Sequence, residues 1–426
     1  MPGADEYPSD AAWDGSVVGE ATENGGVVGR MARLTVCAAL VVLAGCWPQP
    51  NGDADRSGHN PFETTLTTAN AAQLETAWRR ELVGLTGSPV TSAGGVHVVT
   101  STGPSNNPTL HTLRPGDGST AWASPITDFA HRGLSGPWVI GDQVTAGWFY
   151  WQVRPIIVAA GTPSFDVADG DLVADFGGGA VEAQRGRRVL VRREAMSDPL
   201  TLSTYFQLLD LDTRSLVSQW TVPGNAYRVT LGEQRLYVSH FGDVEARSAA
   251  DAALEWTAPV AGWARQPVLS ADGSTVHVVG DPDDGDATLH VLDAATGAVA
   301  WTAPLGGDAE VPALAGGRLY VPVSTGEVLV FDAAGCGAAT CAPLWRSSTG
   351  AARAAAGQPV VAGGVVYTTW TDGTVAGFDA AGCATPPCAP LWSTTTGGGG
   401  AVGGPIVSNG QVYVRTSGAL VAFGLP

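Results

Sequence analysis

The chain has 426 residues, of which 44% are hydrophobic, 57 are glycine and 28 are proline. Its 40 acidic residues outnumber its 22 arginines, there is no lysine, and the formal net charge is −18. This balance excludes nucleic acid as an expected partner, because binding to a phosphate backbone needs a basic face. The chain is long enough to bury a large core. No segment after the N-terminus shows a sustained helical period, which favours an all-β protein.

The N-terminus contains a predicted secretory signal. Residues 31–33 (Met-Ala-Arg) precede an apolar run of ten residues, 34–43, and then the small residues Ala44 and Gly45. This is the layout of a signal peptide over 31–45, and the run is shorter than the roughly 20 residues of a membrane span. Residues 1–30 carry six acids and one arginine, so we expect a non-native upstream extension, with translation starting at Met31.

The residues Leu43-Ala44-Gly45-Cys46 resemble the lipobox of bacterial lipoproteins. In that class the cysteine thiol receives a diacylglyceryl group, and cleavage falls just before it. The resemblance implies that Cys46 is lipidated and that lipid alone anchors the protein to the extracytoplasmic face of the cell membrane. Residues 46–72 would then be a tether that leads into the folded domain.

One sequence motif recurs about every 44 residues. Its clearest copy runs from Val291 through the turn Asp293-Ala294-Ala295-Thr296-Gly297 to Trp301. Each copy ends on an aromatic residue, and these residues are Trp78, Trp122, Phe176, Trp220, Trp256, Trp301, Trp345 and Trp392. A period of this size indicates one small supersecondary unit per repeat, stacked on its neighbours.

Each repeat is predicted to contain four strands. In the clearest copy, short runs rich in β-branched residues cover 266–269, 275–279 and 288–292, and a fourth run ends at Trp301. Turn-forming Asp-Gly and Asp-Pro pairs separate them, as is typical of hairpins. A four-stranded antiparallel unit of about 45 residues is a propeller blade.

The two ends of the chain predict how the ring closes. Residues 73–78 form an orphan strand, whereas the last repeat stops near Phe423 without its final strand. Pairing the two would complete the last blade and remove two exposed sheet edges. Eight aromatic closures then predict an eight-bladed β-propeller, a single domain over 73–426. Seven blades is the alternative, because the second and fourth repeats have irregular lengths.

The densest aromatic run is Trp148-Phe149-Tyr150-Trp151, in the irregular second repeat. Alternation along a strand would place Trp148 and Tyr150 on one face and Trp151 on the other. Packing between blades explains such residues without a function. The alternative is a binding surface, in which the rings form a platform for sugars or anchors for a partner.

Five arginines gather within residues 185–193, and Arg187 and Arg188 lie among them. The plainest interpretation is a solvated hairpin tip. The alternative is a contact for an anionic polymer or an acidic partner. Trp148, Tyr150, Trp151, Arg187 and Arg188 are therefore the candidate binding-surface residues.

Four of the six cysteines form two close pairs in lengthened turns, Cys336 with Cys341 and Cys383 with Cys388. Local disulfides suit an exported protein, and each would stabilise the fold by about 2 kcal/mol. The rival interpretation is a shared zinc site. Equivalent points on neighbouring blades lie roughly 10 Å apart, whereas the ligands of one zinc ion nearly touch, so we predict two disulfides.

Several of these motifs resemble those of the PQQ-like, or quinoprotein-type, β-propeller proteins. They are the Gly-Gly-Val-Val-Tyr strand at 363–367, the Asp-Ala-Ala-Thr-Gly turn, the closing tryptophans and the segments 56–61 and 66–70. The resemblance spans about residues 53–426. The family includes alcohol dehydrogenases that bind pyrroloquinoline quinone and calcium, and non-enzymatic envelope lipoproteins such as the BamB-like assembly factors.

The dehydrogenase branch has features that this sequence lacks. Those enzymes stack the quinone on a disulfide between adjacent cysteines, and the chain has neither a Cys-Cys pair nor a Cys-x-x-Cys-His motif for haem. A calcium-binding set cannot be mapped residue by residue. We therefore assign no catalytic, cofactor-binding or metal-binding residue and expect no cofactor.

Together these observations predict a monomeric, non-catalytic lipoprotein of the cell envelope that binds an envelope or secreted protein and acts as an assembly scaffold. Two alternatives stay open. One is a quinone-dependent oxidoreductase, and the other is a carbohydrate-binding or cell-wall-binding module.

Overall fold

The structure is a computed structural model. It describes residues 46–426 except 102–107, 127–132, 141–142, 151–158, 162, 167–171, 176–179, 199–200, 211–212, 214, 224–227 and 349–350. The described residues belong to one compact unit that begins at Val36. The predicted upstream extension (1–30) and signal peptide (31–45) lie outside the described residues.

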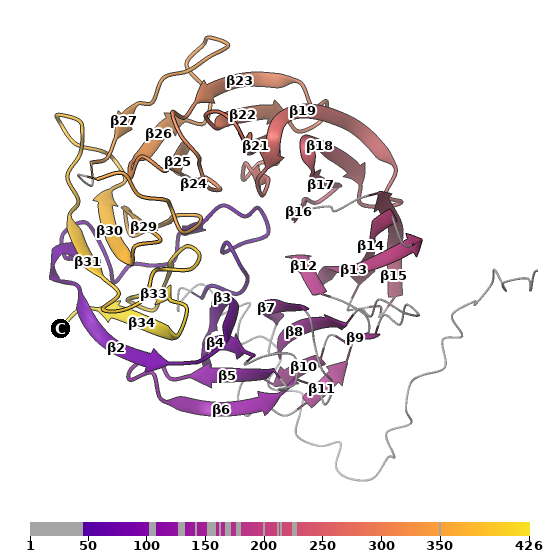
Figure 1. Cartoon of the computed structure of the whole chain (residues 1–426), viewed down its shortest axis with the longest axis horizontal. Coiled ribbons are helices and arrows are strands. Elements are labelled where there is room, and N and C mark those ends of the chain that lie inside the picture. Colours follow the sequence, from indigo (N-terminus) through magenta and orange to yellow (C-terminus); the bar gives the residue numbers. More distant parts are fainter. Residues whose placement is uncertain are drawn as a thin grey trace, which may run out of the picture. The chain divides into compact units, whose positions relative to one another are not determined.

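Strands make up nearly all the regular structure of the described residues. Their single helix is the 3-10 turn η1 (Ala71–Gln73), and no helix of this part is long and apolar enough to cross a bilayer. The predicted all-β class and propeller fold are confirmed (Figure 1).

The described strands form seven sheets. The first contains β3 (Leu85–Ser92), β4 (Gly95–Thr100), β5 (Thr109–Leu113) and β6 (Thr120–Pro125). The second contains β7 (Gly133–Ile140), β8 (Gln143–Tyr150), β9 (Ala159–Gly161), β10 (Pro163–Asp166) and β11 (Leu172–Asp175). The third contains β12 (Ala180–Arg185), β13 (Arg188–Asp198), β14 (Thr201–Asp210) and β15 (Ser215–Pro223).

The fourth sheet is the largest, with eight strands. Its first half contains β16 (Arg228–Leu231), β17 (Arg235–Ser239), β18 (Phe241–Ser248) and β19 (Leu254–Ala264). Its second half contains β20 (Val268–Leu269), β21 (Thr275–Asp281), β22 (Thr288–Asp293) and β23 (Val299–Pro304). The halves are joined because the end of β19 pairs with the end of β21. Sheet pairing therefore connects two units that the sequence repeat separates.

The last three sheets carry the most regular repeats. The fifth contains β24 (Ala313–Ala315), β25 (Arg318–Pro322), β26 (Val328–Asp332) and β27 (Trp345–Arg346). The sixth contains β28 (Val360–Ala362), β29 (Val365–Thr369), β30 (Thr374–Asp379), β31 (Trp392–Thr395) and the added strand β1 (His59–Asn60). The seventh contains β32 (Ile406–Ser408), β33 (Gln411–Arg415), β34 (Ala419–Gly424) and β2 (Glu75–Glu81).

Strand β2 comes from the other end of the sequence and closes the ring. It pairs antiparallel with β34, from Glu75 opposite Gly424 to Glu81 opposite Ala419. Figure 1 shows the indigo β2 beside the yellow β34. The predicted pairing of the first and last strands is confirmed.

Four of the tryptophans that close the repeats pack against glycines of the following repeat. Gly297 has a φ of +74°, and a Cβ placed on it would lie 2.6 Å from Cε3 of Trp256. Both the backbone conformation and the indole therefore require glycine. The same arrangement joins Trp78 to Gly118, Trp301 to Gly335 and Trp345 to Gly382. These four pairs are called the Trp–Gly contacts.

The turn that receives Trp256 is shaped by its own side chains. Asp293 Oδ1 accepts hydrogen bonds from the backbone N–H groups of Ala295 (3.0 Å) and Thr296 (2.8 Å) and from the Thr296 hydroxyl (2.8 Å). These bonds favour the ionised carboxylate and lower the pKa of Asp293. Trp256 Nε1 donates to Ala294 O at 3.1 Å. The repeated turn sequence thus builds a socket for the indole of the preceding repeat.

Both predicted disulfides are present, Cys336 with Cys341 and Cys383 with Cys388. The rival zinc site is therefore wrong, because all four thiols are used in disulfides. Each closed loop also bonds to the preceding sheet. Cys341 N donates to Thr302 O at 2.9 Å, and Cys388 N donates to Arg346 O at 2.8 Å. The two lengthened turns thus act as clasps between neighbouring sheets.

Replacing Gly297 with alanine should destabilise the protein by about 2–5 kcal/mol, because alanine disfavours a positive φ and the new methyl group meets the Trp256 indole. Urea unfolding measures the loss. Gly306→Ala is the matched control, since Gly306 has a φ of +72° and open space around its Cβ position. It should lose only the backbone part, about 1–2 kcal/mol. Equal losses would contradict a packing role for Gly297.

Removing one disulfide with C336S/C341S should lower the free energy of unfolding by about 2 kcal/mol, because the reduced unfolded chain gains loop freedom. Unfolding in oxidising buffer measures the change. A variant with all four of these cysteines replaced should match the wild type measured under reducing conditions. An unchanged free energy of unfolding in C336S/C341S would show that this disulfide does not stabilise the fold.

Candidate functional site

The middle of the ring is occupied by the chain's own N-terminal segment. Residues 46–66, called the central segment, run between the first strands of the sheets (Figure 1). The segment forms hydrogen bonds to residues of all seven described sheets, namely Thr91, Val139, Glu182, Leu269, Leu314, Val361 and Val407. These residues lie in β3, β7, β12, β20, β24, β28 and β32. One stretch of chain therefore ties the sheets together from within.

The central segment is anchored from its first residues. Trp47 N donates to Thr91 Oγ1, and Thr91 N donates back to Trp47 O, both at 2.7 Å. Val139 N donates to Pro48 O at 2.7 Å. Cys46 and Trp47 are both buried. The residue predicted to carry the lipid thus adjoins a fixed point of the fold.

Further along, carbonyl groups of the segment accept hydrogen bonds from successive sheets. The bonds run from Leu269 N to Asp55 O (2.9 Å), from Leu314 N to Ser57 O (2.7 Å) and from Val361 N to Gly58 O (2.8 Å). Asn60 Nδ2 then donates to Val407 O at 2.8 Å. A backbone bonded in this way is held in one path around the ring.

The buried carboxylate of Glu63 holds the end of the segment. It accepts hydrogen bonds from the backbone N–H groups of Thr65 (2.8 Å) and Leu66 (3.0 Å) through one oxygen. Its other oxygen accepts from Gly410 N at 2.9 Å, in the turn between β32 and β33. Three donors satisfy a charge that burial would otherwise penalise.

A cavity of about 680 Å³ lies beside the central segment. Its charged lining consists of Arg56, Arg192, Arg228, Arg265, Glu182, Asp281 and Glu310. Arg192 pairs with Glu182 at 3.0 Å, and Arg265 pairs with Asp281 at 2.5 Å and with Glu310 at 3.6 Å. Burial raises the pKa of Glu310, and the Arg265 charge opposes that rise. Most of the charged side chains that line the cavity therefore form ion pairs with one another.

Arg56 links the central segment to β12. Its guanidinium carbon lies 4.9 Å from the centre of the Trp138 ring. Nη1 donates to Pro50 O at 2.7 Å, and Nη2 donates to Glu182 O. Burial lowers the pKa of Arg56 to about 10, so the side chain stays charged at neutral pH. It is a structural cation with carbonyl and aromatic partners.

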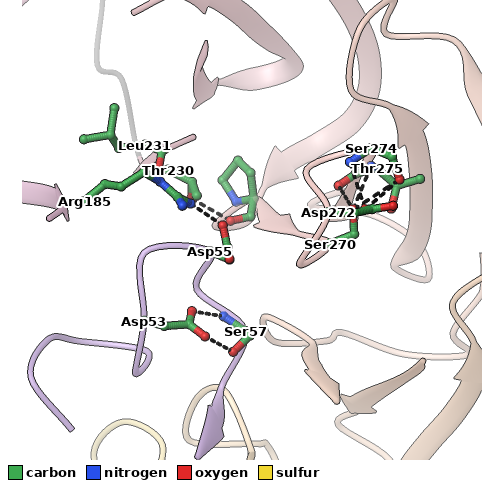
Figure 2. A network of polar contacts seen from close by, with 11 residues as sticks. Asp53, Asp55, Ser57, Arg185, Thr230, Leu231, Ser270, Asp272, Ser274 and Thr275 are labelled. Carbon is green, nitrogen blue, oxygen red and sulfur yellow. Dashed lines mark hydrogen bonds and ion pairs between the residues drawn. The ribbon is translucent and has the colours of Figure 1, made fainter. Parts of the chain in front are cut away.

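Figure 2 shows a second polar network around the central segment. Asp55 pairs with Arg185 of β12, and Arg185 Nε also donates to Leu231 O at 2.8 Å. The Asp53 carboxylate accepts a hydrogen bond from the backbone N–H of Ser57 at 2.9 Å and another from the Ser57 hydroxyl. Burial raises the pKa of Asp55, whereas Arg185 opposes the rise. A cavity of about 240 Å³ adjoins the Asp55 and Arg185 pair.

The predicted aromatic surface is described only in part. Trp148 and Tyr150 lie in β8, where their backbones pair with those of Gly161 and Ala159. Trp151 lies outside the described residues. The aromatic platform stays a prediction.

The predicted arginine segment divides into exposed and inward-facing residues. Arg187 and Arg188 are exposed at the turn between β12 and β13. Arg185 and Arg192 instead form the ion pairs described above. These four arginines therefore do not gather into one basic patch, and a partner contact at Arg187 and Arg188 stays a prediction.

The sequence patterns missed an exposed aromatic pair. Phe241 of β18 and Trp263 of β19 are 54% and 39% exposed, and their ring centroids lie 5.2 Å apart. Trp263 also lines the larger cavity. The one available signal was a tryptophan outside the repeat's closing position, seven residues after Trp256.

The described residues do not fit a quinone with its metal ion. In the described part of the chain, no group of three His, Cys, Asp or Glu side chains could hold a metal. The sequence has no adjacent cysteines on which a quinone could stack. The central segment also occupies the middle of the ring through bonds to every described sheet.

A family model described as "Outer membrane protein assembly factor BamB" matches residues 242–382. This stretch contains three closing tryptophans and one of the disulfides. No curated protein matches the sequence.

Similar solved structures include both an assembly factor and enzymes. BamB from Moraxella catarrhalis is 14% identical with a TM-score of 0.57, covering 82% of this chain and 99% of that chain. A europium-containing methanol dehydrogenase is 13% identical with a TM-score of 0.65, covering 89% and 98%. The quinohemoprotein alcohol dehydrogenase of Comamonas testosteroni is 13% identical with a TM-score of 0.60, covering 91% and 83%.

At these identities the structural likeness concerns the fold alone, and that fold serves binding proteins and oxidoreductases alike. The family model adds sequence agreement over the regular repeats, where the turns, closing tryptophans and strand pairing have been described. The chain is a β-propeller protein that carries PQQ-like repeats over residues 242–382.

Proposed function

We propose that this protein is a non-catalytic, monomeric scaffold of the cell envelope that binds another protein. The central segment is the observation that carries the proposal. It is bonded to all seven described sheets in the place where a propeller could otherwise receive a ligand. A ring tied together from within by its own chain is a rigid body whose rims and faces are available to a partner.

The proposal includes a lipid anchor at Cys46 and a position on the extracytoplasmic face of the membrane. The lipobox-like residues 43–46 and the two disulfides support export. Because Trp47 is held by Thr91, acyl chains on Cys46 would attach next to the rigid propeller. Such an anchor would hold the scaffold close to the membrane surface.

We also propose that the ring has eight blades, with the eight-stranded sheet divided into two. Each half of that sheet ends in a closing tryptophan, Trp256 in β19 and Trp301 in β23. Trp256 packs on Gly297 of the second half in the same way that Trp301 packs on Gly335 of the next sheet. The repeat of this contact supports a blade boundary between the halves.

The family description supports a protein partner. The matched family model is named for an outer-membrane protein assembly factor. The net charge of −18 favours a partner with a complementary basic surface. A quinone-dependent oxidoreductase is disfavoured by the mismatch described above.

The first experiment is crosslinking of the tagged protein in intact envelope, followed by affinity capture. One membrane-associated complex should be enriched over an unrelated lipoprotein, because a scaffold holds its partner at the membrane. Cys46→Ala should reduce that enrichment by removing the anchor. Capture of nothing beyond the control would count against the scaffold.

Replacing Arg56 with methionine should destabilise the protein by about 2–5 kcal/mol, because the half-buried carbonyls of Pro50 and Glu182 both lose their donor. Thermal and urea unfolding measure this loss. Arg346→Met is the matched control, because the Arg346 side chain is 53% exposed and its contact with Glu327 is 3.8 Å long. That change should stay within about 1 kcal/mol. Similar losses would show that Arg56 does not lock the central segment.

A further inference from the structure

We infer that Phe241 and Trp263 form a docking site for a protein segment that presents an arginine or lysine beside an apolar side chain. The inference rests on the proposed function, because it assigns a surface and a partner chemistry to the same scaffold. The site lies where β18 and β19 meet the loop after β21.

The exposure of this pair sets it apart from the other rings. Phe241 is 54% exposed and Trp263 is 39% exposed, and their planes meet at 79°. Every other aromatic pair among the described residues includes at least one buried ring. Neighbouring apolar rings left in water mark interaction surfaces, and tryptophan is enriched among the residues that dominate binding energy.

Contacts within the chain hold the pair in position. Trp263 Nε1 donates to Asp283 Oδ1 at 2.8 Å, and the Trp263 backbone pairs with that of Phe241. Gly262, with a φ of +75°, lets β19 pass close to Pro282, since a Cβ there would lie 2.3 Å from Pro282 Cα. A preorganised anchor loses less side-chain entropy when a partner binds.

One carboxylate contacts the pair and three others lie close to it in the sequence, which indicates a partner of positive charge. Asp283, Asp284 and Asp286 are exposed in the loop after β21, and Asp243 lies two residues beyond Phe241. None of these four carboxylates joins an ion pair in the part of the chain that the structure describes. A cation can therefore bind the aromatic faces and the unpaired carboxylates together.

The geometry favours a protein segment over a sugar. Rings that meet at 79° form a corner and not one flat platform for a pyranose. A corner suits an apolar side chain placed in the open angle outside the two touching rings, with a neighbouring cation reaching the carboxylates. Such a partner buries apolar area at the centre and keeps its charged contacts at the rim, as protein interfaces do.

Selection from a random peptide library against the full chain tests the docking site, with counter-selection against the F241A/W263A variant. Enriched peptides should carry an arginine or lysine next to an apolar residue. Trp263→Ala should weaken their binding about ten-fold or more. D284N/D286N, which leaves the Trp263 bond to Asp283 intact, should weaken binding less and reduce its salt dependence.

Leu254→Ala is the matched control for loss of exposed apolar surface. Leu254 is 52% exposed at the opposite end of β19, so its replacement should leave peptide binding unchanged. Thermal midpoints of all variants check that each one folds. The inference is overturned if no peptide is selected, if the selected peptides lack a cation, or if they bind Trp263→Ala as tightly as the wild type.

Two further results separate this inference from the proposed function. If envelope capture gives the same partner with wild type and F241A/W263A, the scaffold stands and the docking site is wrong. If wild type captures no partner although it selects basic peptides that need Trp263, the scaffold proposal fails and the binding site stands. Binding to a glycan array that is lost in Trp263→Ala would overturn the protein-segment assignment in favour of a sugar site.

Discussion

The packing of a closing tryptophan on a glycine of the next repeat joins neighbouring repeats at four places in this ring. A single four-stranded unit cannot bury its own faces, so each repeat needs a specific contact with its neighbour. Glycine at positive φ supplies it, because the missing Cβ lets the indole lie against the turn. The same contact joins Trp78, near the start of the domain, to Gly118 of the first sheet. Ring closure therefore uses the chemistry that joins the internal repeats.

The central segment adds a second constraint, which acts from within the ring. Backbone carbonyls of Asp55, Ser57 and Gly58 accept hydrogen bonds from three different sheets. Arg56, between them, binds carbonyl groups and stacks on Trp138. These contacts use polar groups of the sheets that face the middle of the ring, and the cavity of about 680 Å³ lies beside them.

The candidate site could be predicted only in part. The disulfides followed from local spacing, since the cysteines of each pair are five positions apart. The arginine segment did not form one patch, because Arg185 and Arg192 find acidic partners on other parts of the chain and on β12 itself. Local sequence does not show which arginines meet distant carboxylates. The Phe241 and Trp263 pair was missed for a similar reason, because its exposure depends on where β19 leaves the core.

By itself, the sequence determined the all-β class, the strand pattern of the regular repeats, the pairing of the two chain ends and the disulfides. Each of these depends on short-range patterns: alternation, turn chemistry and spacing. Only the tertiary structure decided that residues 46–66 fill the middle of the ring and that Trp263 is exposed whereas Trp301 is buried. Both tryptophans lie in strands, and burial is decided by what packs against a strand, which its own residues do not specify.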